Sequence, residues 1–184
     1  MEKRLLENAC SPGIAQQRSN AMMQDTWDRL ERRFAECSEN RVVRDVPNSE
    51  IELASRQIGL RFSPAYAEFV RRYGGASVGA YEIVGLRRAP YMSSDVESVV
   101  DLTNHFRKQQ WPGAENWVVF SMDQGGNPIG LDADGRVWLS DRDCCQIVAI
   151  CQTFEEFLRA YCLLADPEAP GYYDERPWPS NEVQ

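Results

Sequence analysis

Residues 117–151 restrict the fold more than any other stretch, because short apolar runs alternate there with turn sequences. Trp117 to Met122 and Gln146 to Cys151 have the length and apolar character of strands. Between them lies Asp134-Gly135, with apolar residues at every second position on either side. This dipeptide is typical of a two-residue hairpin turn whose central residues both need positive φ. The sequence 124–127 predicts a further turn, so a run of antiparallel strands is expected.

Helical spacing governs the chain before this stretch. Apolar residues three and four positions apart predict helices over residues 23–37, 49–58 and 64–73. Ser49 and Glu52 form a capping-box pattern at the start of the second helix, whereas the third opens with Ser63 as a cap and Pro64 at its first position. A glycine follows each of these two helices, as it does at many helix C-termini.

Three further elements complete the predicted fold. Residues 81–86 suit a strand, Asp95 opens an amphipathic helix, and Thr153 with Glu156 forms a second capping box before the final helix. This order predicts a single α+β domain, in which a mainly antiparallel twisted sheet is packed by N-terminal helices and a closing C-terminal helix. The predicted division is a loose leader, the domain, and a tail rich in proline and aromatic residues, over residues 1–22, 23–165 and 166–184.

The charge of the chain narrows the classes of partner. Its 184 residues carry a net charge of −8, and acidic excess repels phosphate backbones, so nucleic acid is not expected as a partner. The charge favours association with a basic protein, although it also fits plain solubility. No stretch approaches the roughly 20 apolar residues that span a bilayer, so no membrane partner is expected. The polar start, with no secretory signal, predicts a cytoplasmic protein.

Neither the cysteines nor the single histidine form a pattern expected of an active site. The six cysteines are scattered apart from the pair Cys144-Cys145, which could bind a soft metal or form a strained disulfide; reduced, mostly buried thiols are the simpler interpretation. His105 stands alone on a predicted helix, which indicates a surface or packing role. A cysteine–histidine nucleophile is the remaining enzymatic alternative. We therefore expect no catalytic residue, no metal site and no cofactor.

One cluster of charges suggests a binding surface. Five aspartates lie in or beside the predicted hairpins: Asp123, Asp132, Asp134, Asp141 and Asp143. An acidic rim of this kind suits a basic surface on a partner protein, because close and desolvated charge pairs couple strongly. A solvated acidic loop explains the same residues without any partner. The sequence leaves the oligomeric state open.

Three segments, taken in order, point to a family. The first is Leu60 to Gly75, with its proline, aromatic residues and paired glycines, and the second runs from Trp117 through Gly126-Asn127 to Gly135. The third is Thr153 to Leu158, in the final predicted helix. Together they resemble the SUKH superfamily with its SMI/KNR-type domain, which includes the yeast cell-wall-synthesis regulator and many bacterial immunity proteins. The resemblance covers roughly residues 25–165.

This resemblance implies a small binding domain. Bacterial members of the superfamily typically neutralise a cognate toxin, often a nuclease or another intracellular enzyme, by a stoichiometric protein–protein interaction. The implied function is therefore that of an immunity protein in a polymorphic toxin or toxin–antitoxin system, with a basic toxin as partner. The alternative is a regulatory interaction module whose partner is not a toxin. Residues 141–145 and the chain after Asp166 match nothing shared by the family, so they are candidates for individual specificity.

Overall fold

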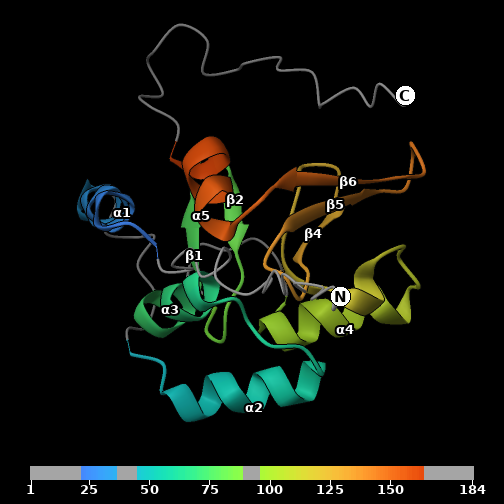
Figure 1. Ribbon diagram of the computed structural model, residues 1–184, viewed down its shortest axis with the longest axis horizontal. Coiled ribbons are helices and arrows are strands. Elements are labelled where there is room, and N and C mark those ends of the chain that lie inside the picture. Colours follow the sequence, from blue (N-terminus) through green and yellow to red (C-terminus); the bar gives the residue numbers. More distant parts are fainter. Residues whose placement is uncertain (1–21, 37–44, 89–95, 164–184) are drawn as a thin grey trace, which may run out of the picture.

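The computed structural model describes residues 22–36, 45–88 and 96–163, and these form a single α+β domain (Figure 1). The helices are α1 (Gln24–Glu36), α2 (Asn48–Ile58), α3 (Pro64–Tyr73), α4 (Val99–Lys108) and α5 (Phe154–Phe157). A 3-10 turn (Ala114–Asn116) precedes the main sheet, and a π-helical turn (Leu158–Cys162) extends α5. The strands are β1 (Ala76–Val78), β2 (Tyr81–Ile83), β3 (Val118–Met122), β4 (Pro128–Leu131), β5 (Val137–Asp141) and β6 (Gln146–Cys151).

The strands form two antiparallel sheets. Strands β1 and β2 pair as a short hairpin, while β3, β4, β5 and β6 form a meander in that order. Each strand of the meander pairs with the next in the chain, so local turns fix the register. The two sheets meet where the Val84 N–H donates to the Phe120 carbonyl at 2.8 Å. The predicted antiparallel sheet is thus confirmed, with β3 and β6 as its outer strands.

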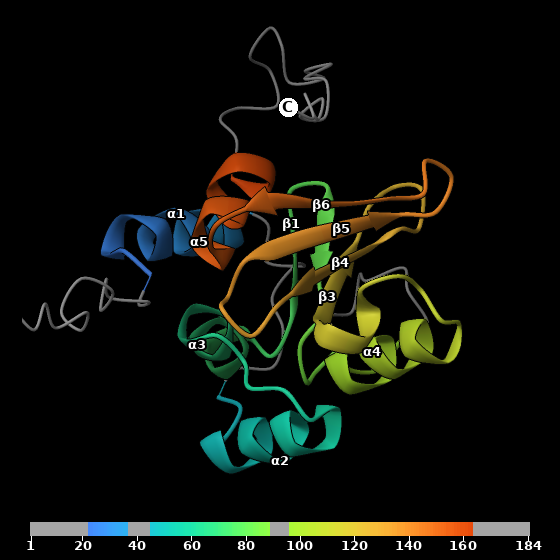
Figure 2. The same cartoon turned by 45° about the vertical axis from the view of Figure 1, so that its right-hand side comes forward.

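The helices pack below the sheet and to one side of it, in the predicted order along the chain. Figures 1 and 2 show α2 below α3 and α4, with α1 beside α5. Helix α1 contacts the C-terminal segment through Thr26, whose hydroxyl donates to the Glu155 carboxylate, and through an ion pair of Asp25 with Arg159 at 3.1 Å. The first and last helices therefore close the domain together.

The core is built around aromatic side chains. Tyr66 is completely buried, and its ring lies 5.3 Å from Phe154 and 5.7 Å from Phe120, measured between centroids. The Tyr66 hydroxyl donates to the Val84 carbonyl, so the one polar atom of this ring has a partner. Burial raises the pKa of Tyr66 well above its usual value. Tyr66 belongs to the first of the three family-like segments, Leu60 to Gly75, so this segment supplies the centre of the core.

Several predicted helix ends are confirmed. The Ser63 hydroxyl accepts a hydrogen bond from the Tyr66 N–H, and Pro64 is the first residue of α3. Gly59 and Gly74, after α2 and α3, have φ values of 77° and 70°. Thr153 caps α5 by accepting from the Glu156 N–H at 3.1 Å.

Other local predictions need correction. The predicted capping box of Ser49 is wrong, because α2 already begins at Asn48, after Pro47, without a side-chain cap. In the second capping box, the Glu156 carboxylate accepts from the N–H of Gln152 rather than from that of the capping threonine. The strand expected over residues 81–86 ends at Ile83.

The turn at Asp134-Gly135 also differs from the prediction. Positive φ occurs only at Gly135, with a value of 84°, so this is not the two-residue hairpin turn. Instead, the Gly135 N–H donates to the Asp132 carbonyl and the Asp132 N–H donates to the Arg136 carbonyl, each at 3.1 Å. Five residues therefore lie between the paired strand ends Leu131 and Val137, and the bond of Asp132 to Arg136 narrows the turn itself to the three residues 133–135.

Some predictions lie outside the described residues. These are Asp95 as the start of a helix, Cys37 at the end of the first helix, and the structure of the tail. Among the described residues, which resume at Val96, α4 starts after Ser98, and the Ser98 hydroxyl accepts a hydrogen bond from the Asp101 N–H at 3.3 Å. Of the predicted leader, only Met22 is described, and it is buried.

Candidate functional site

The meander separates the five candidate aspartates into two groups. Asp123, Asp141 and Asp143 lie at the end of the sheet that holds the β3–β4 and β5–β6 turns. Asp132 and Asp134 lie in the β4–β5 turn at the opposite end. Because β5 has five residues and a strand rises about 3.3 Å per residue, roughly 15 Å separates the two groups. The expected single acidic rim is therefore not formed.

The first group lies on two turns that contact each other. The Asp123 carboxylate accepts hydrogen bonds from the N–H groups of Gly125 and Asn127, both at 2.8 Å, and from the Asn127 side-chain amide at 3.0 Å. The Asn127 side-chain oxygen in turn accepts from the Arg142 N–H in the β5–β6 turn at 3.4 Å. These bonds hold the acidic side chains of this end in ordered turns.

Negative charge dominates the β5–β6 turn. The Asp141 carboxylate accepts from the Cys144 N–H at 3.0 Å, and this hydrogen bond lowers the pKa of Asp141 below its usual value. The Arg142 guanidinium lies over the Trp111 ring, 4.2 Å from its centroid, and donates to the Gln109 carbonyl at 3.3 Å. The arginine thus reaches back toward the end of α4, and the acidic groups remain at the tip of the hairpin.

The second group serves the fold more directly. The Asp132 carboxylate accepts from the N–H groups of Asp134 and Arg136, both at 2.9 Å, and from the Trp138 indole N–H at 2.8 Å. Asp134 is exposed at the tip of the same turn. Of the two residues, Asp134 is therefore the one available to a partner, while Asp132 shapes the turn that presents it.

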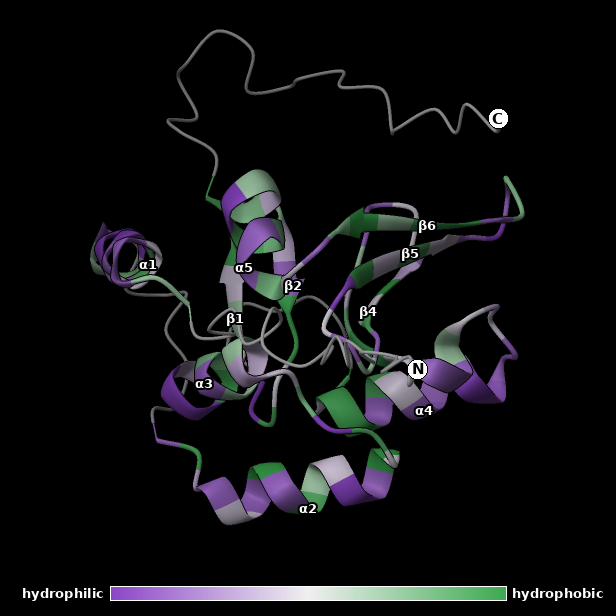
Figure 3. Ribbon diagram, viewed as in Figure 1, coloured by the Kyte–Doolittle hydropathy of each residue, from purple (hydrophilic) through white to green (hydrophobic). Residues whose placement is uncertain are grey.

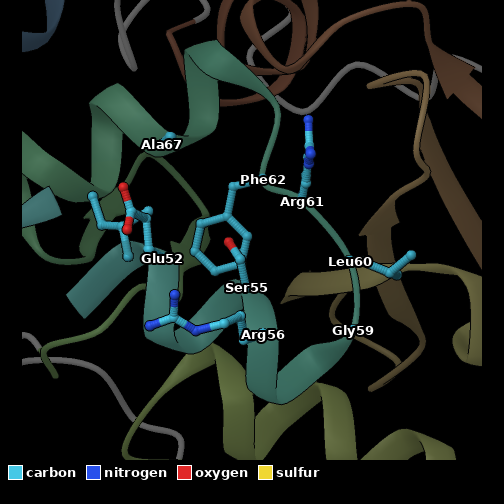
Figure 4. Close-up of a pocket in the computed structure, with 9 residues that line it drawn as sticks. Glu52, Ser55, Arg56, Gly59, Leu60, Arg61, Phe62 and Ala67 are labelled. Atoms are coloured by element: carbon cyan, nitrogen blue, oxygen red, sulfur yellow. The ribbon is translucent and has the colours of Figure 1, made fainter. Parts of the chain in front are cut away.

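A groove lies near this second group, between α2 and the segment that leads into α3. Its volume is about 680 Å³, and Figure 4 shows the Phe62 ring in the middle of it, with Glu52 and Arg56 of α2 beside the ring. An added Cβ on Gly135 would lie 3.4 Å from the Ser63 Cβ, so the β4–β5 turn borders the start of α3. The groove combines an apolar floor with charged rims.

The four described cysteines and His105 form no common cluster. Cys151 and Cys162 are buried, and burial raises the pKa of the Cys151 thiol to about 12. Cys144 and Cys145 are exposed free thiols in the β5–β6 turn, so the expectation of mostly buried thiols fails for this pair. His105 is exposed on α4, and its Nε2 lies 2.9 Å from the Gln109 side-chain nitrogen. Among the described residues, no group of three or more His, Cys, Asp or Glu side chains is placed to hold a metal ion.

Sequence reasoning missed one surface. The apolar run of β6 predicted a strand, but the structure places this strand at the edge of the sheet, with the Ile147 side chain 44% exposed. The absence of charge from residues 146–151 was visible in the sequence. Only the pairing order shows that no described strand pairs with the outer side of this uncharged strand.

Comparison with known protein families agrees with this architecture. The SMI1 / KNR4 family (SUKH-1) matches residues 46–160, from the segment before α2 to the π-helical turn. The chain belongs to this family. No curated protein matches the chain in sequence. Family membership supports a protein-interaction role of the immunity type, and it confirms the resemblance drawn from the three sequence segments.

The matched segment contains all the surfaces described above. It includes both groups of aspartates, the groove and β6, whereas α1 and the tail lie outside it. Within the described parts of the chain, no helix is both long and apolar enough to cross a membrane.

Proposed function

We propose that this protein is an immunity protein, which binds a cognate intracellular bacterial toxin stoichiometrically and neutralises it. The observation that carries the proposal is the acidic end of the sheet in a domain of the SMI1 / KNR4 family. Asp123, Asp141 and Asp143 are presented there by ordered turns. A preformed acidic surface suits a toxin whose own site is basic, such as a nuclease that binds phosphate groups.

The neutralisation itself is tested by a protection assay. The gene adjacent to that of this protein is expressed in bacteria with and without this protein, and cell survival is counted. We expect the adjacent gene to be toxic alone and harmless in the presence of this protein, with a complex of fixed stoichiometry on co-purification. Toxicity without rescue, or no toxicity, would favour the alternative, a regulatory interaction module with a partner that is not a toxin.

The contact surface is tested by reversing charge at each end of the sheet. We expect Asp141→Lys/Asp143→Lys to slow association with the toxin and to weaken the dependence of the association rate on salt, because opposite charges steer the encounter. Asp134→Lys is the control for Asp143→Lys alone, since each reverses one exposed charge and the two residues lie at opposite ends of the sheet. Stopped-flow or biosensor rates between low and physiological salt measure the difference. A larger effect of the control variant would move the contact to the groove beside α3.

A further inference from the structure

The two edges of the main sheet differ in whether neighbouring elements hydrogen-bond to them. At the β3 edge, the Thr103 hydroxyl of α4 accepts from the Val119 N–H at 3.1 Å and donates to the Val119 carbonyl at 3.4 Å. The next carbonyl, that of Phe120, accepts from the Val84 N–H. Neighbouring elements therefore cover this edge. Strand β6 forms the other edge, and none of the described elements pairs with its outer side.

The register shows which residues of β6 direct their backbone outward. The Asp132 N–H donates to the Arg136 carbonyl, and successive residues of an antiparallel strand bond to alternate sides. Residues 138 and 140 therefore bond toward β4, and residues 139 and 141 toward β6. The partners of 139 and 141 are Val148 and Gln146. Gln146 and Val148 therefore hydrogen-bond to β5. Ile147 lies between them and Ala149 follows Val148, so these two residues direct their backbone N–H and C=O groups away from β5.

The side chains of β6 do not protect this edge. Ile147 is 44% exposed, Ala149 is also exposed, and no charged residue or proline occurs in residues 146–151. Figure 3 shows the strand as hydrophobic over most of its length. The irregular pairing with β5 lies between Val137 and Trp138, so residues 146–149 keep a regular register. Natural sheets usually guard such an edge with lysine, proline or a bulge, which makes this strand a ready template for another strand.

We propose that β6 binds an extended segment of a partner protein, which adds to the sheet as a fifth strand and carries Lys or Arg at both of its ends. The added strand would hydrogen-bond to Ile147 and Ala149 and cover their side chains. This proposal deepens the proposed function by naming how the partner is held. It rests on that function only for the identity of the partner, because the geometry of the edge applies to any protein with a suitable segment.

Charge at the two ends of β6 selects this occupant over a second copy of the chain. Asp141 and Asp143 lie before the strand, and the exposed Glu156 lies shortly after it. Two copies paired antiparallel by a two-fold axis would bring the aspartates of one copy beside the glutamate of the other. This repulsion disfavours self-pairing, whereas a segment with basic ends would meet an opposite charge at each end.

The test uses a defined probe, so it does not depend on a toxin. A short synthetic peptide of alternating Val and Thr with two lysines at each end is titrated into the full-length protein, and backbone amides are followed by NMR. A peptide of the same core with glutamates at its ends is the charge control. We expect saturable shifts centred on Ile147 and Ala149 with the lysine peptide, slower hydrogen exchange at these two amides, and at least tenfold weaker binding of the glutamate peptide.

A pair of variants separates backbone pairing from side-chain contact. Ala149→Pro removes an outward N–H that has no partner among the described residues, and Ala149→Ser keeps the N–H with a side chain of similar size. We expect the proline variant to lose at least tenfold in affinity for the lysine peptide and the serine variant to stay within about twofold. Leu53→Ala, at an exposed apolar residue of α2, should bind as the parent does. Circular dichroism and thermal melting show whether each variant is folded.

Each result of these experiments either supports or overturns the β6 proposal. Peptide shifts centred outside β6, equal binding of the two peptides, or full binding by a folded proline variant would each overturn the proposal. Protection of the β6 amides that grows with protein concentration alone would assign the edge to a second copy and would also overturn it. If the edge binds the lysine peptide while the adjacent gene is not neutralised, the proposed toxin partner is wrong and the edge site stands. The wild-type NMR experiment decides the question even if the proline variant does not fold.

Discussion

Thr103→Val tests how the β3 edge is closed. Thr103 is fully buried in α4, and its hydroxyl serves both the N–H and the carbonyl of Val119. Valine has nearly the same shape, so the change removes the hydroxyl and leaves a buried N–H without a partner. Such a group costs about 1–3 kcal/mol. We therefore expect the free energy of unfolding to fall by about 2 kcal/mol.

Thr103→Ser is the matched control. It keeps the hydroxyl and removes one methyl group, which costs about 1 kcal/mol in a packed site. The hydrogen-bond argument thus predicts that the valine variant is the less stable of the two. If packing around Thr103 dominated, the order would be reversed.

Urea unfolding and thermal melting measure this order. A loss of about 2 kcal/mol corresponds to a Tm lower by roughly 4–8 °C for a domain of this size. Hydrogen exchange should also quicken at the Val119 amide in the valine variant. A valine variant as stable as the parent, with unchanged exchange at Val119, would refute the account of the covered edge.

Two further predictions concern packing and pH. Gly130→Ala should lower the free energy of unfolding by about 1–3 kcal/mol in urea titrations, because the added Cβ would lie 2.7 Å from the Trp117 Cβ; a neutral effect would show that the backbone at Trp117 shifts at little cost. Glu68 accepts hydrogen bonds from Arg71 and Arg72, each at 2.6 Å, and the Arg71 bond is the main cause that lowers its pKa from 4.5 to about 2. A lowered carboxylate pKa stabilises the fold above pH 4.5, and this contribution is lost as the pH falls toward 2. Glu68→Gln should therefore cost about 1 kcal/mol at pH 7, after allowance for solvent screening, and the difference from the parent should vanish at acid pH; a constant difference across this range would contradict the ion-pair explanation.

Elements with strong local signals were predictable because neighbours in the sequence determine them. The start of α3 follows from Ser63 and Pro64, and its end from Gly74, whose φ of 70° favours glycine. The meander also follows from local turns between successive apolar runs. Predictions failed where a longer-range contact competed. Strand β2, for example, stops at Ile83 because the next residue bonds to β3 instead of continuing the hairpin.

The candidate surfaces depended far more on tertiary structure. The sequence determined that five aspartates lie near turns and that β6 is uncharged, and its segments were sufficient to place the chain in its family. It did not show that Asp123 and Asp141 meet at one end while Asp134 lies at the other, since strand direction separates residues that are close in the sequence. Nor did it show which sheet edge is covered. Thr103 reaches Val119 from sixteen residues away, and such non-local contacts cover β3, while none of the described elements pairs with the outer side of β6.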